Sequence, residues 1–239
     1  MTESRLLRFA KGAHVLQNGL IGVLARWHPE FVHSVEKIQA IKMAFHFVNY
    51  EGIQGDYVEF GVFEGASFIS AYKCHRATNA PLQVQRRFFG FDSFQGLRFD
   101  EGEAVHRRLE LGRFATDYPM VKRRVAKVIR NEVEWQLVPG FLDETLTSED
   151  TAKFRIDKIA MALFDLDLGE PTKLALDFVA PRLQEGSAII FDEFFMFRGD
   201  NDAGEAGALK TFAAAHPNIV LRRYRDYGGG GRVFIVTKV

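Results

Sequence analysis

Short apolar runs alternate along the chain with longer segments whose apolar positions recur at helical spacing. The clearest run, Ile159 to Phe164, contains no polar residue, which is typical of a central parallel strand buried on both faces. The expected strands are residues 57–59, 86–92, 133–138, 159–164, 188–191, 219–225 and 233–238, and the expected helices are 66–77, 121–130, 171–183 and 207–216. Strands that alternate with helices predict a single α/β domain, closed by a strand pair.

Residues 1 to about 50 precede the first strand and have a helical pattern, with apolar residues at Ile38, Ile41, Phe45 and Val48. We expect a helical N-terminal leader (1–50) before the main domain (51–239). The leader could cover the ligand site as a lid, form a subunit contact in a homo-oligomer, or simply cap the core. The histidines of this segment do not have a spacing that predicts a metal site.

Charge and composition exclude several classes of protein. Lys plus Arg equals Asp plus Glu at 31 each, so no overall field favours nucleic acid or an anionic membrane. The uncharged segment from Gly12 to Ala25 is interrupted by polar residues and is shorter than the roughly 20 apolar residues of a membrane span. Cys74 is the only cysteine, which excludes an intrachain disulfide. We expect a cytoplasmic protein with a small-molecule partner and neither nucleic-acid nor membrane partners.

Acidic residues follow four of the expected strands. Because the carboxyl ends of parallel strands meet at one edge of a sheet, residues far apart in sequence can line one cleft there. The acids are Glu59, Asp92, Asp165 with Asp167, and Asp192 with Glu193. A single acid at a strand end often only caps the next helix. Four strand ends in series favour a common site over coincidence.

The glycine turn after the first strand narrows the choice of ligand. Gly61 and Gly65 flank Val-Phe-Glu, which is not the Gly-x-Gly-x-x-Gly fingerprint, and Glu64 would place negative charge near a pyrophosphate. An NAD-dependent oxidoreductase is therefore the disfavoured alternative. Glu59 suits an ammonium or sulfonium charge, and Asp92 lies where an acid can accept ribose hydroxyls. S-adenosylmethionine carries both of these charges, a ribose and no phosphate.

Five motifs, in order, resemble those of the macrocin O-methyltransferase (TylF/MycF-like) family of class I S-adenosylmethionine-dependent enzymes, which methylate sugars and natural products. They are residues 58–67 (VEFGVFEGAS), 90–97 (GFDSFQGL), 140–146 (GFLDETL), 165–172 (DLDLGEPT) and 189–194 (IIFDEF). The resemblance implies a Rossmann-like class I methyltransferase fold. Its sheet would have seven mostly parallel strands with a reversed last strand, and helices on both faces.

The resemblance also implies site residues. Glu59 and Gly61 would meet the methionine part of the cofactor, Asp92 its ribose, and Gly140 with Phe141 its adenine. The cofactor-binding set is completed by Gly65, Ser67, Ser93 and Asp165.

In characterised members of the macrocin O-methyltransferase family, which this sequence resembles, acids after the fourth and fifth strands hold a divalent metal, usually magnesium. The corresponding residues here are Asp165, Asp192 and Glu193, whose hard oxygens suit Mg²⁺. The metal would orient a hydroxyl and lower its pKa, while Asp165 or Asp167 acts as general base. The expected reaction is methyl transfer to a hydroxyl of a small polar acceptor, a sugar or a natural product. The non-enzymatic alternative is a methyltransferase-like binding module.

Overall fold

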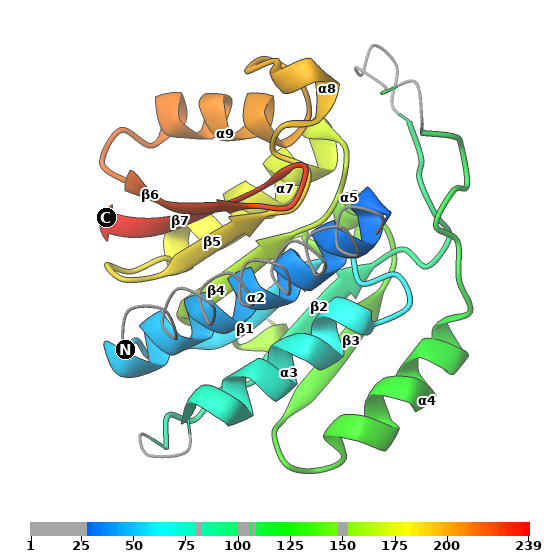
Figure 1. The fold of residues 1–239 in the computed structure, drawn as a ribbon, viewed down its shortest axis with the longest axis vertical. Coiled ribbons are helices and arrows are strands. Elements are labelled where there is room, and N and C mark those ends of the chain that lie inside the picture. The colour runs from blue at the N-terminus through cyan, green and yellow to red at the C-terminus, as the bar shows by residue number, and fades with distance from the viewer. Residues whose placement is uncertain (1–27, 80–82, 100–105, 107–108, 148–152) are drawn as a thin grey trace, which may run out of the picture.

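The computed structural model describes residues 28–79, 83–99, 106, 109–147 and 153–239. They form a seven-stranded sheet in the order β3-β2-β1-β4-β5-β7-β6 (Figure 1). The strands are β1 (Asp56–Phe60), β2 (Phe88–Asp92), β3 (Trp135–Pro139), β4 (Ile159–Phe164), β5 (Ala188–Phe191), β6 (Val220–Tyr227) and β7 (Gly231–Lys238). Each expected strand is present.

Strands β1 to β5 are paired in parallel, and β7 runs antiparallel to both β5 and β6. The predicted reversed last strand is therefore confirmed. Strands β6 and β7 form a hairpin through Gly228 to Gly230, as the glycine run predicted. Since the chain crosses over between β3 and β4, the carboxyl ends of β1 and β4 lie side by side at the point where the strand order reverses, the usual place for a ligand.

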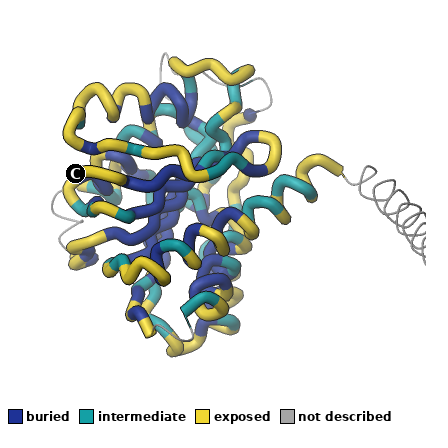
Figure 2. Tube along the Cα trace, turned by 60° about the vertical axis from the view of Figure 1, so that its left-hand side comes forward, coloured by how far each residue is buried: buried dark blue, intermediate teal, exposed yellow. Residues whose placement is uncertain are grey.

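Helices cover both faces of the sheet because successive strand residues point to opposite sides. Tyr57 packs with the helices of one face, and Val58 and Phe60 pack with those of the other. One face carries α2 (Pro29–Tyr50), α3 (Ala66–Asn79) and α4 (Tyr118–Ile129); the other carries α7 (Gly169–Val179) and α9 (Gly204–Ala215). The short elements α5 (Leu142–Thr145), η1 (Ala180–Arg182) and α8 (Met196–Gly199) connect them. Figure 2 shows the buried strands between these layers.

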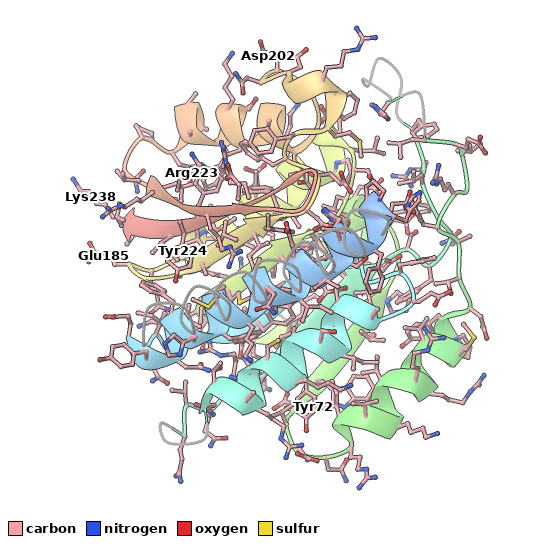
Figure 3. All side chains as sticks on the ribbon, in the orientation of Figure 1. Tyr72, Glu185, Asp202, Arg223, Tyr224 and Lys238 are labelled. Atoms are coloured by element: carbon pink, nitrogen blue, oxygen red, sulfur yellow. The ribbon has the colours of Figure 1, made fainter. Side chains whose placement is uncertain are left out.

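Helix α2 is the described part of the predicted leader. Its buried stripe, which includes Ile41, Ala44, Phe45 and Val48, belongs to the same hydrophobic cluster as the sheet face beneath it. Phe47 also contacts the ring of Tyr224 on β6, with centroids 5.7 Å apart. Tyr224 is labelled among the side chains in Figure 3. Helix α2 is thus packed into the core of the domain.

The proposed domain boundary at residue 50, the lid and the oligomer contact all stay predictions. Residues 1–27, with the Gly12 to Ala25 segment, lie outside the described part of the chain. Among the helices that are described, none has both the length and the apolar character needed to cross a bilayer.

Candidate active site

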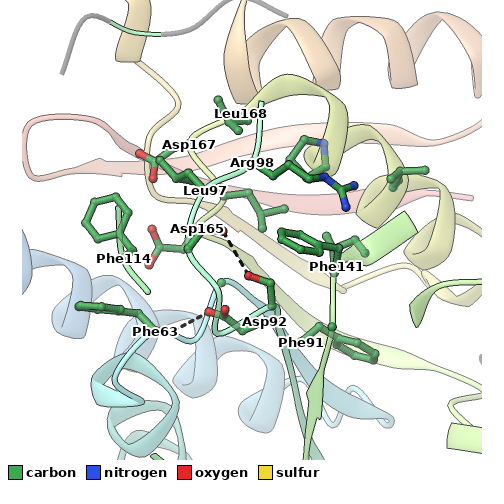
Figure 4. Close-up of a pocket in the computed structure, with 18 of the residues that line it drawn as sticks. Phe63, Phe91, Asp92, Leu97, Arg98, Phe114, Phe141, Asp165, Asp167 and Leu168 are labelled. Atoms are coloured by element: carbon green, nitrogen blue, oxygen red, sulfur yellow. Dashed lines mark hydrogen bonds between the residues drawn. The ribbon is translucent and has the colours of Figure 1, made fainter. Parts of the chain in front are cut away.

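A cavity of about 210 Å³ opens at the carboxyl ends of β1 to β4. Six of the predicted site residues line it: Gly61, Asp92, Ser93, Gly140, Phe141 and Asp165, and the predicted base Asp167 lines it too. Figure 4 shows the three aspartates between a wall made by Phe63 and Phe114 and a second wall made by Phe141 and Arg98. Of the four acidic strand ends expected to share one site, those after β2 and β4 line the cavity, whereas Glu59, Asp192 and Glu193 do not.

Gly61 allows the ends of β1 and β4 to approach closely. Its φ is +87°, in the left-handed region that favours glycine, and a Cβ built there would lie 1.9 Å from the carbonyl oxygen of Asp165. The amide of Asp165 in turn donates to the carbonyl of Phe60 at 2.9 Å. A side chain at residue 61 would push the two strand ends apart, so the glycine is required by this contact.

Asp92 holds the turn after β1. Its Oδ2 accepts hydrogen bonds from the backbone amides of Val62 and Phe63, both at 2.7 Å, and its Oδ1 accepts one from Phe94 at 2.6 Å. A carboxylate oxygen has two lone-pair positions, so Oδ1 retains one acceptor position, and Asp92 lines the cavity. Asp92 can therefore bind a ligand hydroxyl while it fixes the turn.

Glu59, Gly65 and Ser67, the other predicted cofactor residues near this turn, do not line the cavity. Glu59 is fully buried and accepts hydrogen bonds from the hydroxyls of Tyr57 and Ser67, both at 2.5 Å. Burial raises the pKa of Glu59 to about 7, although both hydrogen bonds oppose the shift. Glu59 is therefore held inside the protein next to the turn by Tyr57 and Ser67. Its predicted contact with a cofactor stays a prediction.

The turns after β2 and β3 form the other wall. The hydroxyl of Ser93 accepts from the amide of Gln95 at 3.1 Å and closes the 93–96 turn. The guanidinium of Arg98 lies 4.1 Å from the ring centroid of Phe141 and pairs with Asp143 at 2.6 Å. This apolar surface with a polar rim suits a flat aromatic group such as adenine.

Beside the cavity, a lysine bridges two of the predicted metal ligands. Lys37 Nζ on α2 lies 2.6 Å from Asp165 Oδ2 and 2.8 Å from Asp192 Oδ2. Burial alone would lower the pKa of Lys37, but the two carboxylates hold it well above its ordinary value. Lys37 is separated from these acids by more than a hundred residues, and no pattern in the sequence predicts its position.

His33 and Tyr227 complete the surroundings of Asp192. The Tyr227 hydroxyl donates to Asp192 Oδ1 at 2.7 Å, and His33 Nε2 lies 3.2 Å from the same oxygen. Burial would raise the pKa of Asp192, but Lys37 and His33 hold it well below its ordinary range. His33 also falls within 4.8 Å of ligand atoms of Asp192 and Glu193, a grouping that the spacing of the histidines in the leader does not indicate.

The remaining acids of this cluster are Asp167, Glu193 and Glu205. Burial, followed by neighbouring carboxylates, raises the pKa of Asp167 to about 7 and that of Glu193 to about 8. Glu205 on α9 is 1% exposed and accepts from the backbone amides of Leu166 at 3.3 Å and Glu193 at 2.9 Å, which ties the loops after β4 and β5 together. Sequence reasoning missed Glu205 because it lies inside a helix.

In this structure the Lys37 ammonium lies between two of the predicted metal ligands, Asp165 and Asp192. Carboxylate oxygens are suitable donors for Mg²⁺, which binds them at about 2.0–2.1 Å. The facing oxygens of Asp165 and Asp192, however, are both occupied by the Lys37 ammonium. Among the described residues, the group whose ligand atoms come close enough together is His33, Asp192 and Glu193, without Asp165.

The strand order, the reversed β7 and the cavity at the strand ends define the fold of a class I O-methyltransferase. The structure superposes on the O-methyltransferase NovP with a TM-score of 0.67 and 22% identity, over 84% of this chain and 79% of that one. The sequence profile of the macrocin-O-methyltransferase (TylF) family matches residues 26–212. The chain belongs to this family of enzymes.

Two characterised relatives are O-methyltransferases of Streptomyces. An 8-demethyl-8-(2,3-dimethoxy-alpha-L-rhamnosyl)-tetracenomycin-C 4'-O-methyltransferase of Streptomyces olivaceus is 27% identical over 72% of this chain and 66% of its own length. A demethyldecarbamoylnovobiocin O-methyltransferase of Streptomyces niveus is 26% identical over 71% of this chain and 64% of its own length. The matched region thus spans slightly less than two thirds of either relative.

Proposed function

We propose that the protein is an S-adenosylmethionine-dependent O-methyltransferase that methylates a hydroxyl of a sugar or of a sugar-bearing natural product. The observation that carries this proposal is the cavity at the carboxyl ends of β1 to β4, in a member of the macrocin-O-methyltransferase family. The acceptor class is supported by the two Streptomyces relatives, one of which acts on a rhamnosyl group.

The cavity lining fits this cofactor better than a dinucleotide. Asp92 offers an acceptor to ribose hydroxyls, and Phe141, with the Arg98 guanidinium over its ring, lines the part of the cavity proposed for adenine. Asp92, Asp165 and Asp167 make the lining acidic, which opposes a diphosphate. Glu64, in contrast, pairs with Arg124 at 3.0 Å and does not line the cavity. The three aspartates, and not Glu64, therefore disfavour the binding of NAD.

Asp167 is the better placed of the two predicted general bases. Both line the cavity, but Asp165 Oδ2 is held by Lys37, whereas Asp167 has a left-handed backbone conformation with φ of 61°. Such conformations in residues other than glycine concentrate at functional sites. When bound, S-adenosylmethionine supplies a methyl group activated by the sulfonium charge. The Asp167 carboxylate would take the proton from the acceptor hydroxyl as its oxygen forms the new bond to carbon.

The predicted magnesium requirement stays a prediction and is not used in this proposal. Asp165 and Asp192 have suitable oxygen atoms, but Lys37 would have to leave before a metal could bridge them. Proton transfer to Asp167 and the in-line positioning of two bound reactants require no metal step.

The test is a methylation assay on the purified protein with S-adenosylmethionine and a panel of nucleotide sugars and glycosylated natural products. Mass spectrometry should detect an acceptor heavier by one methylene group, together with S-adenosylhomocysteine. The proposal fails if neither S-adenosylmethionine nor S-adenosylhomocysteine binds. Binding of S-adenosylhomocysteine without turnover of any acceptor in the panel would favour the binding module instead.

A further inference from the structure

The Lys37 ammonium occupies the position between two acids where the family resemblance predicts a divalent cation. It donates to Asp165 Oδ2 and Asp192 Oδ2, one carboxylate from the end of β4 and one from the end of β5. A metal bonded to both of these oxygens would lie within a few ångströms of the ammonium nitrogen, because Nζ is itself 2.6 Å and 2.8 Å from them. Two cations cannot share this space, so the ammonium and the metal are alternatives.

The surroundings of Lys37 hold it in place. Its side chain is 13% exposed, and the adjoining turns of α2 place Ala40, Ile41 and Ala44 at 0% exposure in the core. His33 lies one turn earlier on the same face of α2 and approaches the other oxygen of Asp192. A lysine that reaches two acids from a packed helix is a built part of the site, not a mobile surface charge.

The same face of α2 is also tied to the hairpin beyond β5. Glu36 accepts a hydrogen bond from the amide of Gly228, and His33 Nδ1 accepts one from Gly229 at 3.3 Å. These contacts fix the rotation of α2 about its axis. The direction of the Lys37 side chain is therefore set by packing on one side and by the hairpin on the other.

We propose that Lys37 is an internal replacement for the divalent cation, so that the native protein binds no metal between Asp165 and Asp192. The ammonium neutralises and aligns the two carboxylates, as a metal would. Because Asp165 lines the cavity and Lys37 does not, Lys37 is a positioning residue that acts through Asp165. Only this role in methyl transfer rests on the proposed function; the claim about metal binding does not.

The experiment measures Mn²⁺ binding by electron paramagnetic resonance on metal-stripped protein without cofactor. The variants are Lys37→Ala and, as the matched control, Lys42→Ala, which removes an exposed lysine of the same helix. Native protein and Lys42→Ala should show no Mn²⁺ site. Lys37→Ala should gain one, because two facing carboxylates are then left without a cation, and the added change Asp192→Asn should abolish it.

Thermal unfolding provides a second readout if Lys37→Ala is too unstable to purify in quantity. EDTA, Mg²⁺ and Mn²⁺ should leave the Tm of the native protein unchanged, whereas Mg²⁺ or Mn²⁺ should raise the Tm of Lys37→Ala. A Mn²⁺ site in the native protein that Asp165→Asn and Asp192→Asn each remove would overturn the proposal. So would a folded Lys37→Ala protein that gains no Mn²⁺ site.

Failure of the proposed function would be visible separately. S-adenosylhomocysteine binding by calorimetry, measured on the same native sample, reports on the cofactor site alone. Native protein that binds the cofactor product and also binds Mn²⁺ at the two acids would refute the replacement while leaving the methyltransferase assignment intact. Protein that binds neither would refute the methyltransferase assignment but support the replacement.

Discussion

The two sides of the cavity are held together by different kinds of interaction. On the side of β1 to β3, the turns are fixed by backbone hydrogen bonds to Asp92 and by the close approach that Gly61 permits. On the side of β4 and β5, charged side chains are fixed by partners from distant elements, above all Lys37 of α2. The first arrangement is local and should depend on backbone geometry, whereas the second should depend on charge balance.

The largest effect should come from removing the charge of the predicted base on the second side. Asp167→Asn should lower the rate of methyl transfer by about 10²–10⁴-fold, the usual contribution of a general base. Affinity for S-adenosylhomocysteine should change little, and so should the rate of the control Asp177→Asn, which alters an exposed acid of α7. Single-turnover kinetics measure this, and a rate within a few-fold of native would remove Asp167 from the mechanism.

On the first side, Gly61→Ala should destabilise the fold by about 2–5 kcal/mol, because backbone strain adds to the clash with Asp165. Gly52→Ala is the matched control, since Gly52 also has a positive φ, of 66°, but a Cβ there would meet nothing within 4 Å. The free energies of unfolding of the two variants in urea separate the cost of the positive φ, which both positions share, from the cost of the clash with Asp165, which only Gly61 has. Equal losses would show that the approach of β1 and β4 is not what requires a glycine.

Asp92→Ala tests whether the turn is held by its carboxylate. Three backbone amides lose their acceptor, and we expect a loss of about 2–3 kcal/mol in the free energy of unfolding. Asp117→Ala, at an exposed helix start whose side chain makes no capping hydrogen bond, should stay within about 0.5 kcal/mol of native. A loss for Asp92→Ala as small as this control would contradict the account.

A smaller, pH-dependent effect is expected for Glu59, which lies under the first side. Its pKa is about 7 in the fold, above the ordinary 4.5, so the folded state binds the proton more tightly and stability falls as pH rises from 4.5 to 7. Between pH 5 and pH 8.5, native protein should lose roughly 2–3 kcal/mol more than Glu59→Gln. Urea unfolding at both pH values measures the difference, and parallel losses would place the pKa of Glu59 near its ordinary value.

The sequence predicted the first side well and the second side only in part. The strands and helices follow from the hydrophobic pattern, whereas the reversed β7 and the residues of the turns were implied by the family resemblance. The acids after β4 and β5 were also predicted, since each directly follows a strand. Their partners Lys37, Tyr227 and Glu205 were not predicted, because they lie inside regular elements and meet the acids only through the tertiary fold.

Glu59 shows a further limit of reasoning from sequence. Its predicted contact with the cofactor stays a prediction, but its hydrogen-bond donors in the structure, the hydroxyls of Tyr57 and Ser67, were not foreseen. In a strand, a shift of one residue exchanges the two faces. The face of the sheet on which an acid lies therefore decides its environment, and the motif alone does not show which face that is.

Calorimetric titration with S-adenosylhomocysteine tests the central claim, that the cavity at the carboxyl ends of β1 to β4 holds the methyl donor. Native protein should bind it in a single saturable process. Phe141→Ala should weaken this binding by about tenfold or more, equivalent to about 1.4 kcal/mol, because an aromatic ring that lines the cavity is lost. No binding to native protein, or binding that Phe141→Ala leaves unchanged, would contradict the account.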